Sequence, residues 1–317
     1  MVRVTVCEGE AGLLTEHKKS GLNKLLYWPL CRAYARHIVR DKPADAIYRS
    51  LCALHFRRKH GFWPNFVHPR RFSEKLWSRM LHERDPLLTV VSDKLRVRDY
   101  VAGRVGPDYL IPLLWSGPRP EHIPFDDLPR KFVIKANHGC RYNILVRDKT
   151  QLDQANTRRQ LERWLAQNYC QDLGLGIEWG YKNIKPSLIV ESMMEEDGKA
   201  PEDYKFWCFS GRVECITLHF GRFQKHTVRT LDRNFKPSEY AFPLDNGRSE
   251  YQLPANCEEM IKVAESLADG FEFMRVDLYN IQGRIYFGEM TPYPLGIYPF
   301  RLPARLDYAL AEKWKSA

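Results

Sequence analysis

The stretch 273–290 constrains the fold more than any other part of this 317-residue sequence. It reads FMRVDLYNIQGRIYFGEM, two runs rich in β-branched and aromatic residues around a Gln-Gly-Arg turn, which is typical of a β-hairpin. If all three residues form the turn, Asp277 lies opposite Glu289 and Arg275 lies opposite Thr291. Carboxylates that face each other destabilise a sheet unless a cation lies near them. The hairpin therefore predicts a metal ion or an ion pair at this point.

Two interpretations of this hairpin remain open from the sequence. In the first, Asp277 and Glu289 are ligands of Mg²⁺, which binds proteins through one or two carboxylates and completes its shell with water and phosphate oxygens. Arg275 would then hold a phosphoryl oxygen. In the second, Arg275 only neutralises Asp277. A two-residue turn would defeat the pairing, because it would move Glu289 to the other face of the sheet.

The remaining sequence from residue 131 onward alternates short apolar runs with polar loops, which predicts an α+β fold with more than one sheet. A Ser-Gly turn at 210–211 predicts a second hairpin. We expect strands at 131–136, 143–148, 187–192, 204–210, 212–220 and 227–232, and helices at 157–170 and 255–269.

The N-terminal residues 22–60 form a helical pattern that carries several cations, including Lys24, Arg32 and Arg36. One interpretation is a helical region packed on the core. The other is a basic amphipathic helix that rests on an anionic membrane or on an acidic partner.

Composition narrows the classes of function. The chain has 49 Lys and Arg against 39 Asp and Glu, a net charge of +10, which favours acidic partners: nucleic acid, anionic lipid, nucleotide or an acidic polymer. Its eight cysteines form no C-x-x-C pair and we find no secretory signal, so we expect free thiols in a cytosolic protein. No apolar run approaches the roughly 20 residues that span a bilayer.

Catalytic motifs based on a nucleophile or zinc are absent from the sequence, as is a P-loop, so any chemistry rests on carboxylates and cations. Lys135 ends an apolar strand, and the loop after it contains His138 and Gly139, whose backbone N–H groups can close over phosphates. Glu191 ends another strand and is followed by Met193 and Met194, which either line a pocket for an adenine ring or fill the core.

Five segments in this order resemble the TupA-like branch of the ATP-grasp superfamily, which is associated with teichuronopeptide and other cell-surface polysaccharide biosynthesis. They are HPRRFSEKLWSRML, VSDKLRVRDYV, KFVIKANHGCRYN, LIVESMMEEDGKAPEDYKFWCFSGRV and RVDLYNIQGRIYFGEMTPYP. The resemblance extends from about Phe66 to Tyr298 and implies an ATP-grasp fold, in which two α+β subdomains clasp ATP.

The resemblance also implies a domain organisation. Residues 1–92 would be a basic, mainly helical N-terminal region, and residues 93–317 the catalytic domain. Within this domain, we expect a nucleotide-gripping subdomain at about 125–190 and a metal-binding subdomain at about 191–300.

Site residues follow from the resemblance position by position. Arg98 would contact phosphate, with Lys94 as a neighbouring candidate, and Lys135 would hold the α and β phosphates. Arg275 would steady the transferred phosphoryl group. Glu191, Ser192, Met193 and Met194 would form the hinge that binds adenine. Asp203 would bind the ribose, and Lys205 would be a further nucleotide contact. The metal ligands would be Asp277, Glu289 and Thr291. Many relatives have Asn where this chain has Thr291, whose hydroxyl is still an oxygen donor.

The implied activity is that of an ATP- and Mg²⁺-dependent carboxylate–amine ligase that forms an amide through an acylphosphate. The expected partners are ATP, an acidic saccharide or peptide such as a uronic-acid or glutamyl precursor of a capsule-type polysaccharide, and an amine donor. We expect no nucleic-acid partner, and the basic N-terminal helix would allow association with the inner face of the membrane. Two alternatives remain: a phosphotransferase of the same fold, and a basic non-enzymatic protein that binds nucleic acid or membrane.

Overall fold

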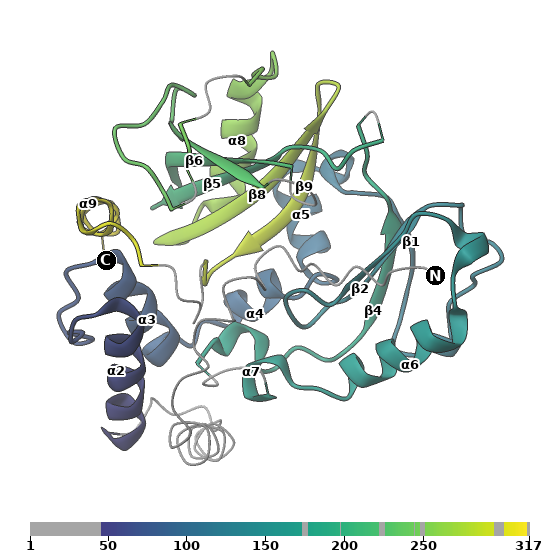
Figure 1. Ribbon diagram of the computed structural model, residues 1–317, viewed down its shortest axis with the longest axis horizontal. Coiled ribbons are helices and arrows are strands. Elements are labelled where there is room, and N and C mark those ends of the chain that lie inside the picture. The colour runs from purple at the N-terminus through teal and green to yellow at the C-terminus, as the bar shows by residue number, and fades with distance from the viewer. Residues whose placement is uncertain are drawn as a thin grey trace.

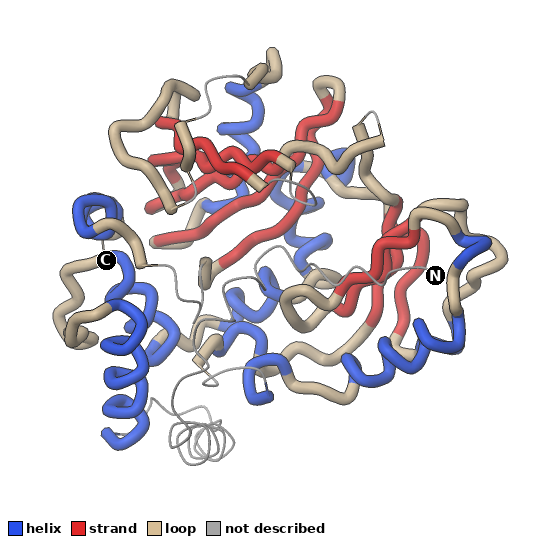
Figure 2. Tube along the Cα trace, viewed as in Figure 1, coloured by secondary structure: helices blue, strands red, loops and turns tan. Residues whose placement is uncertain are grey.

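Two antiparallel sheets and the helices around them make up the part of the chain that the computed structural model describes, residues 46–172, 177–196, 198–221, 226–243, 245–247, 251–294 and 301–315 (Figure 1, Figure 2). This confirms the α+β class and the presence of more than one sheet. Short 3₁₀ helices lie at Pro107–Tyr109, Pro120–His122, Lys149–Gln151 and Trp179–Tyr181. None of the described helices is long and apolar enough to cross a bilayer.

The N-terminal helices α2 (Ala46–His60) and α3 (Phe72–His82) pack with the C-terminal helix α9 (Ala304–Lys313), which lies beside α3 in Figure 1. Helix α3 buries an apolar stripe that includes Phe72, Leu76 and Trp77. The helical pattern predicted at 22–60 is confirmed over α2, and its first part, residues 22–45, lies outside the described residues.

Residues 93–96 join helices α4 (Pro86–Ser92) and α5 (Val97–Val105), and Asp93 is the C-cap of α4. Asp85 caps α4 by accepting a hydrogen bond from the Leu87 N–H at 2.8 Å, and Pro at the first helical position already has a helical φ. The Asp93 carboxylate accepts hydrogen bonds from the Leu95 N–H and from Asn137 Nδ2, both at 2.9 Å. This junction fixes the segment that carries Lys94 and Arg98.

The smaller sheet has the strand order β1-β4-β2-β3. Its strands are β1 (Leu113–Gly117), β2 (Phe132–Ala136), β3 (Asn143–Val146) and β4 (Leu188–Ser192). Phe132, Ile134 and Val190 point to one face and pack with helix α6 (Gln154–Leu165), which the short helix α7 (Tyr169–Asp172) follows. Strand alternation therefore sends Lys135 and Glu191 to the opposite face. The sheet includes β1, which precedes the predicted start of the nucleotide-gripping subdomain at about 125.

The larger sheet has the strand order β7-β6-β5-β8-β9. Its strands are β5 (Asp203–Phe209), β6 (Arg212–Phe220), β7 (Thr227–Asp232), β8 (Phe273–Ile281) and β9 (Arg284–Thr291). Helix α8 (Cys257–Ala268) packs on the face that carries Phe206, Val276 and Leu278. The opposite face carries charged residues, and at its end Phe273 packs against Phe72 of α3, with ring centroids 5.1 Å apart.

The predicted three-residue turn of the 273–290 hairpin is wrong, although the predicted pairing is right. Ile281 pairs with Arg284, so the turn is only Gln282 and Gly283, with φ values of 51° and 82°. Positive φ at both central residues is typical of the type I′ turn, whose twist matches that of the strands.

A β-bulge at Gly288 restores the pairing. Leu278 pairs with Phe287, but the next pair is Asp277 with Glu289, because one residue of β9 is left over between them. A Cβ atom on Gly288 would lie 3.0 Å from the Asp277 carbonyl oxygen, so a residue without a side chain suits this position.

Candidate active site

Charged side chains gather on the two sheet faces that α6 and α8 do not cover. On the smaller sheet, Lys135 and Glu191 meet Arg98 of α5, and we call these three residues the Glu191 cluster. On the larger sheet lies the Asp277 cluster, which consists of Asp203, Lys205, Arg275, Asp277, Glu289 and Thr291.

In the Glu191 cluster, one carboxylate bridges two cations. Arg98 Nη1 donates to Glu191 Oε1 at 2.8 Å, and Lys135 Nζ donates to Oε2 at 2.7 Å. Arg98 Nη2 also donates to the Ile111 carbonyl at 2.9 Å, which fixes the guanidinium. Glu191 is the partner that a lysine at the end of a buried strand requires. With two cations and one carboxylate, the cluster has a formal charge of +1.

The loop between β2 and β3 is anchored to the segment before α5. Lys94 Nζ donates to the Gly139 carbonyl at 2.6 Å, and the Lys94 N–H donates to the Asn137 carbonyl at 3.1 Å. Asn137 Oδ1 accepts from the Ser187 N–H at 2.7 Å. A Cβ atom on Gly139 would lie 2.7 Å from the Tyr169 ring, so this loop passes too close to its neighbours for a larger residue.

His138 lies inside this loop rather than on its surface. Its Nε2 is 3.0 Å from the Trp164 carbonyl oxygen, and its ring meets that of Tyr142 edge-on at 5.5 Å. Burial lowers the pKa of His138, and Lys94 lowers it further. The imidazole therefore makes its contacts inside the protein. The predicted role in phosphate binding fits the backbone N–H groups of this loop rather than the His138 side chain.

In the Asp277 cluster, both oxygens of Asp277 accept hydrogen bonds from cations. Lys205 Nζ lies 2.5 Å from Asp277 Oδ2 and 2.6 Å from Asp203 Oδ2. Arg275 binds Asp277 in a bidentate manner, with Nε 2.7 Å from Oδ1 and Nη2 2.8 Å from Oδ2. Arg275 Nη2 also donates to Thr291 Oγ1 at 3.1 Å. The ion pair between Arg275 and Asp277 thus coexists with the predicted register.

Glu289 differs from Asp277, since its half-buried carboxylate forms no ion pair or hydrogen bond with the described residues. It lies near the β2–β3 loop. Burial raises the pKa of the Cys140 thiol, the Glu289 carboxylate raises it further, and Lys94 lowers it. These influences place Glu289, Cys140 and Lys94 in one electrostatic neighbourhood, which joins the loop to the hairpin.

The donor set of the Asp277 cluster fits Mg²⁺. Asp277, Glu289 and Thr291 offer carboxylate and hydroxyl oxygens, the hard ligands that Mg²⁺ prefers. Nowhere in the described residues do three or more His, Cys, Asp or Glu side chains gather in a metal-binding group. An ion held here would draw the rest of its shell from water and phosphate oxygens, and Asp277 would exchange part of its contacts with Lys205 or Arg275.

The predicted adenine hinge lies at the end of β4. The Ser192 N–H donates to the Pro112 carbonyl at 3.0 Å, and Met193 and Met194 follow as half-buried residues. Asp203, the predicted ribose ligand, is buried against Lys205. Of the predicted residues, contacts therefore join Glu191 to both Arg98 and Lys135, and Lys94 to the loop. Lys205 joins Asp203 to Asp277 of the hairpin.

Sequence reasoning missed three polar residues beside the Asp277 cluster: Thr217, His219 and His226. In the register of β5 and β6, Thr217 is opposite Lys205 and His219 is opposite Asp203. His219 Nδ1 is 3.0 Å from His226 Nε2, and its Nε2 is 3.2 Å from Thr217 Oγ1. The alternation of β6 and the predicted Ser-Gly turn were the signal that could have found Thr217 and His219, whereas His226 lies outside β6.

Comparison with known proteins identifies the family. A family model described as TupA-like ATPgrasp matches residues 74–315. The chain belongs to the TupA-like ATP-grasp family. The fold that the five segments implied is thus confirmed. A search of curated proteins found no match.

Among solved structures, this TupA-like chain is similar to D-alanine–D-alanine ligase from Bacillus anthracis complexed with ATP, with 16% identity and a TM-score of 0.38. It is also similar to the ATP-grasp ligase PsnB complexed with minimal precursor (11%, 0.40) and to N5-carboxyaminoimidazole synthetase from Staphylococcus aureus complexed with ADP (11%, 0.43). The matches cover 65%, 72% and 72% of this chain, which spans 56%, 62% and 53% of those proteins.

Proposed function

We propose that this TupA-like ATP-grasp protein is an ATP-dependent carboxylate–amine ligase. The observation that carries the proposal is the register of the β8–β9 hairpin, which sets Asp277 opposite Glu289 with Arg275 and Lys205 in contact. In a chain of this family, that arrangement supports a phosphoryl-transfer site.

The Glu191 cluster is the proposed phosphate-binding part of the site. Its formal positive charge suits the nucleotide's phosphates, which Lys135 and Arg98 would bind, with Lys94 and the backbone at Gly139 beside them. The ends of β4 and β5 would bind the nucleoside, Met193 and Met194 packing on adenine and Asp203 accepting from the ribose hydroxyls.

The proposed reaction has two steps. The substrate carboxylate attacks the γ-phosphorus of ATP, the bond to the bridging oxygen breaks, and ADP leaves. The amine then attacks the acylphosphate carbon, phosphate leaves, and the proton of the amine passes to solvent. Arg275 and Lys135 offset the charge that develops on the transferred phosphoryl group. When bound by Asp277, Glu289 and Thr291, Mg²⁺ supplies further neutralisation of the phosphate oxygens.

The proposed substrate is an acidic saccharide or peptide, a precursor of a cell-surface polysaccharide. The net charge of +10 supports an anionic substrate. The association of TupA-like proteins with cell-surface polysaccharide biosynthesis, which the five segments imply, is the ground for the polysaccharide role. No disulfide joins the six described cysteines, Cys52, Cys140, Cys170, Cys208, Cys215 and Cys257, which supports a cytosolic location. Cys7 and Cys31 lie outside the described residues.

Thermal unfolding with Mg-ATP tests the site. A ligand that binds only the folded protein raises its stability by about 2.7 kcal/mol at 100 times the dissociation constant. We expect a clear rise in melting temperature for the wild type and a smaller rise for Lys135→Met. An unchanged melting temperature in the wild type would refute the proposal.

A screen of uronic acids and glutamyl peptides against amines, followed by ADP release, tests the reaction itself. A ligase releases one phosphate for every amide formed. ADP release without free phosphate would instead indicate the phosphotransferase alternative.

A further inference from the structure

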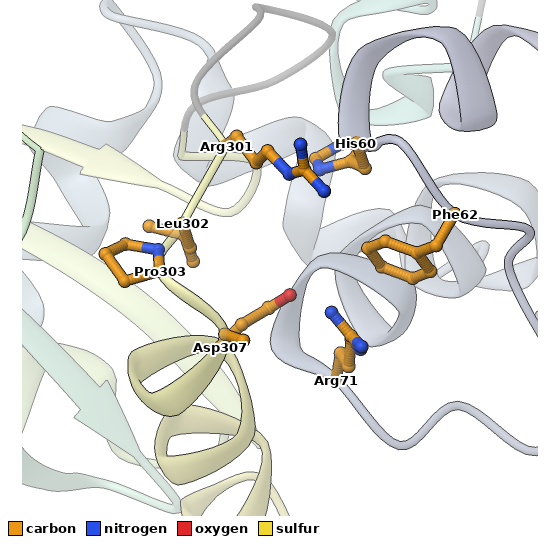
Figure 3. A pocket seen from close by; sticks show the side chains of 8 residues that line it. His60, Phe62, Arg71, Arg301, Leu302, Pro303 and Asp307 are labelled. Atoms are coloured by element: carbon orange, nitrogen blue, oxygen red, sulfur yellow. The ribbon is translucent and has the colours of Figure 1, made fainter.

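A cavity of about 340 Å³ lies where the end of α2, the start of α3 and the start of α9 meet (Figure 3). We call it the α2–α9 pocket. Its size is at the lower end of the range for small-molecule sites. The residues that line it are His60, Phe62, Arg71, Arg301, Leu302, Pro303, Ala304 and Asp307. None of them belongs to the Glu191 or Asp277 cluster.

Arg71 lies on one wall of this pocket without a carboxylate partner. Its guanidinium carbon is 3.9 Å from the centroid of the Phe62 ring and 4.6 Å from that of Tyr308. Aromatic rings hold a guanidinium in place by cation–π attraction without neutralising its charge. Among the described residues no carboxylate forms an ion pair with Arg71.

Arg301 supplies the second cation, and Figure 3 shows its guanidinium beside His60. It packs on the backbone of Gly61, where an added Cβ atom would lie 2.8 Å from Nη2. Within the part of the chain that the structure describes, Arg301 also has no carboxylate within ion-pair distance. Guanidinium groups bind carboxylates and phosphates through two parallel hydrogen bonds.

The pocket also contains groups that suit hydroxyls. The Asp307 carboxylate accepts hydrogen bonds from the N–H and the hydroxyl of Ser73, both at 2.8 Å. Burial, together with the charges of Lys59, Arg301 and Arg71, lowers the pKa of His60 to about 4, so its imidazole is neutral at pH 7. A neutral imidazole both donates and accepts hydrogen bonds.

These features suit a ligand that carries both a negative charge and hydroxyl groups. The two guanidinium groups exceed the single carboxylate by one positive charge, which favours an anion. The Asp307 oxygens and the His60 ring accept hydrogen bonds, which a carboxylate or a doubly ionised phosphate ester cannot supply but a hydroxyl can. Leu302 and Pro303 form an apolar wall, which suits the C–H face of a small ring.

We propose that the α2–α9 pocket binds a small hydroxylated molecule that carries a carboxylate or a phosphate. Arg71 and Arg301 hold the oxyanion, and Asp307 and His60 contact the hydroxyls. The proposal does not depend on the ligase activity, since no residue of the active site takes part.

Isothermal titration tests this proposal with four probes: D-glucuronate, glucose 6-phosphate, inorganic phosphate and D-glucose. The wild type is compared with Arg301→Gln and with Arg305→Gln. Arg305 is a matched control because it is exposed on the same segment, pairs with Glu239 at 3.2 Å and does not line the pocket.

We expect D-glucuronate or glucose 6-phosphate to bind the wild type and Arg305→Gln equally, and Arg301→Gln at least tenfold more weakly. The tighter of these two probes identifies the oxyanion as carboxylate or phosphate. Equal affinity in Arg301→Gln and the wild type, or no binding of either probe, would overturn the proposal. Equal affinity for inorganic phosphate and glucose 6-phosphate, or for D-glucose and D-glucuronate, would also contradict it.

Discussion

The Glu191 and Asp277 clusters are built from the same unit, a carboxylate that bridges two cations. Glu191 lies between Arg98 and Lys135, and Asp277 lies between Arg275 and Lys205. They differ in what surrounds the unit. Among the described residues, Glu191 is the carboxylate that pairs with Arg98 and Lys135, whereas Asp203 and Glu289 add two further carboxylates to the Asp277 cluster. The formal charges are therefore +1 and −1.

The lysines of the two clusters also differ in exposure to solvent. The Lys135 side chain is 23% exposed, and that of Lys205 is 7% exposed. A more exposed cation exchanges its partner for a ligand at lower cost, because less desolvation has to be offset. The comparison teaches that similar ion pairs suit opposite ligands: the Glu191 cluster suits phosphate, and the Asp277 cluster suits a metal ion.

The largest effects are expected for substitutions of the two hairpin carboxylates, and the effect on stability distinguishes Asp277 from Glu289. Asp277→Asn and Glu289→Gln should both lower ADP formation about 100-fold or more, because each removes a charged ligand from the reaction site. Asp277→Asn should also destabilise the metal-free protein by about 3 kcal/mol, since Lys205 and Arg275 lose their shared partner. Glu289→Gln should change stability by less than about 1 kcal/mol, because its carboxylate has no such partner among the described residues.

Urea unfolding without metal and coupled ADP release measure the two properties. Relief of like-charge repulsion, which the sequence alone suggests for both variants, is expected only at Glu289, because the structure shows cations on both Asp277 oxygens. An Asp277→Asn variant that is destabilised but fully active would show that the cluster is a scaffold.

The next effect concerns the bulge that brings Asp277 and Glu289 together. Gly288→Ala should lower the free energy of unfolding by about 2 kcal/mol and lower ADP formation about tenfold, because the new Cβ atom would clash with the Asp277 carbonyl oxygen and disturb the register. Gly283→Ala is the control, since its Cβ meets open space and only the φ of 82° is unfavourable. Gly283→Ala should lower the free energy of unfolding by about 1 kcal/mol and leave ATP turnover unchanged. Equal turnover in the two variants would show that the bulge does not set the site.

A smaller effect is expected at Glu191. Glu191→Gln leaves Arg98 and Lys135 without their carboxylate, so the free protein should lose stability while Mg-ADP stabilises the variant more than the wild type, by about 1 kcal/mol. Melting temperatures with and without Mg-ADP measure the difference. If Mg-ADP stabilised both proteins equally, the Glu191 cluster would not be the phosphate site.

The smallest effect depends on pH. Burial lowers the pKa of His219 well below 6.5, and the neighbouring Lys205 of the Asp277 cluster lowers it further. Below about pH 6.5 the unfolded chain therefore binds a proton that the folded protein does not, and stability falls as the pH falls. His219→Gln should reduce this fall by up to about 1.4 kcal/mol for each pH unit. Urea unfolding at neutral pH and on acidification measures it, and an unchanged slope would contradict the buried, neutral His219.

The sequence by itself determined the family and most of the strands, although not β1. The sequence placed Lys135 and Glu191 near the ends of apolar strands, as β2 and β4 confirm, and it paired the two carboxylates of the 273–290 hairpin correctly, although from a three-residue turn that is wrong. The strands follow from local periodicity, because side chains in a strand alternate with a period of two. Five ordered segments were enough to identify the ATP-grasp fold.

Only the tertiary structure decided which of these side chains meet. The bulge at Gly288 restored the pairing of Asp277 with Glu289 after a turn one residue shorter than expected, and no sequence pattern predicted this bulge. The contact of Arg98 with Glu191 joins residues 93 positions apart, and the α2–α9 pocket joins segments from the two ends of the described chain. The physical reason is that periodicity encodes the direction of a side chain, whereas its partner depends on how helices and sheets pack together.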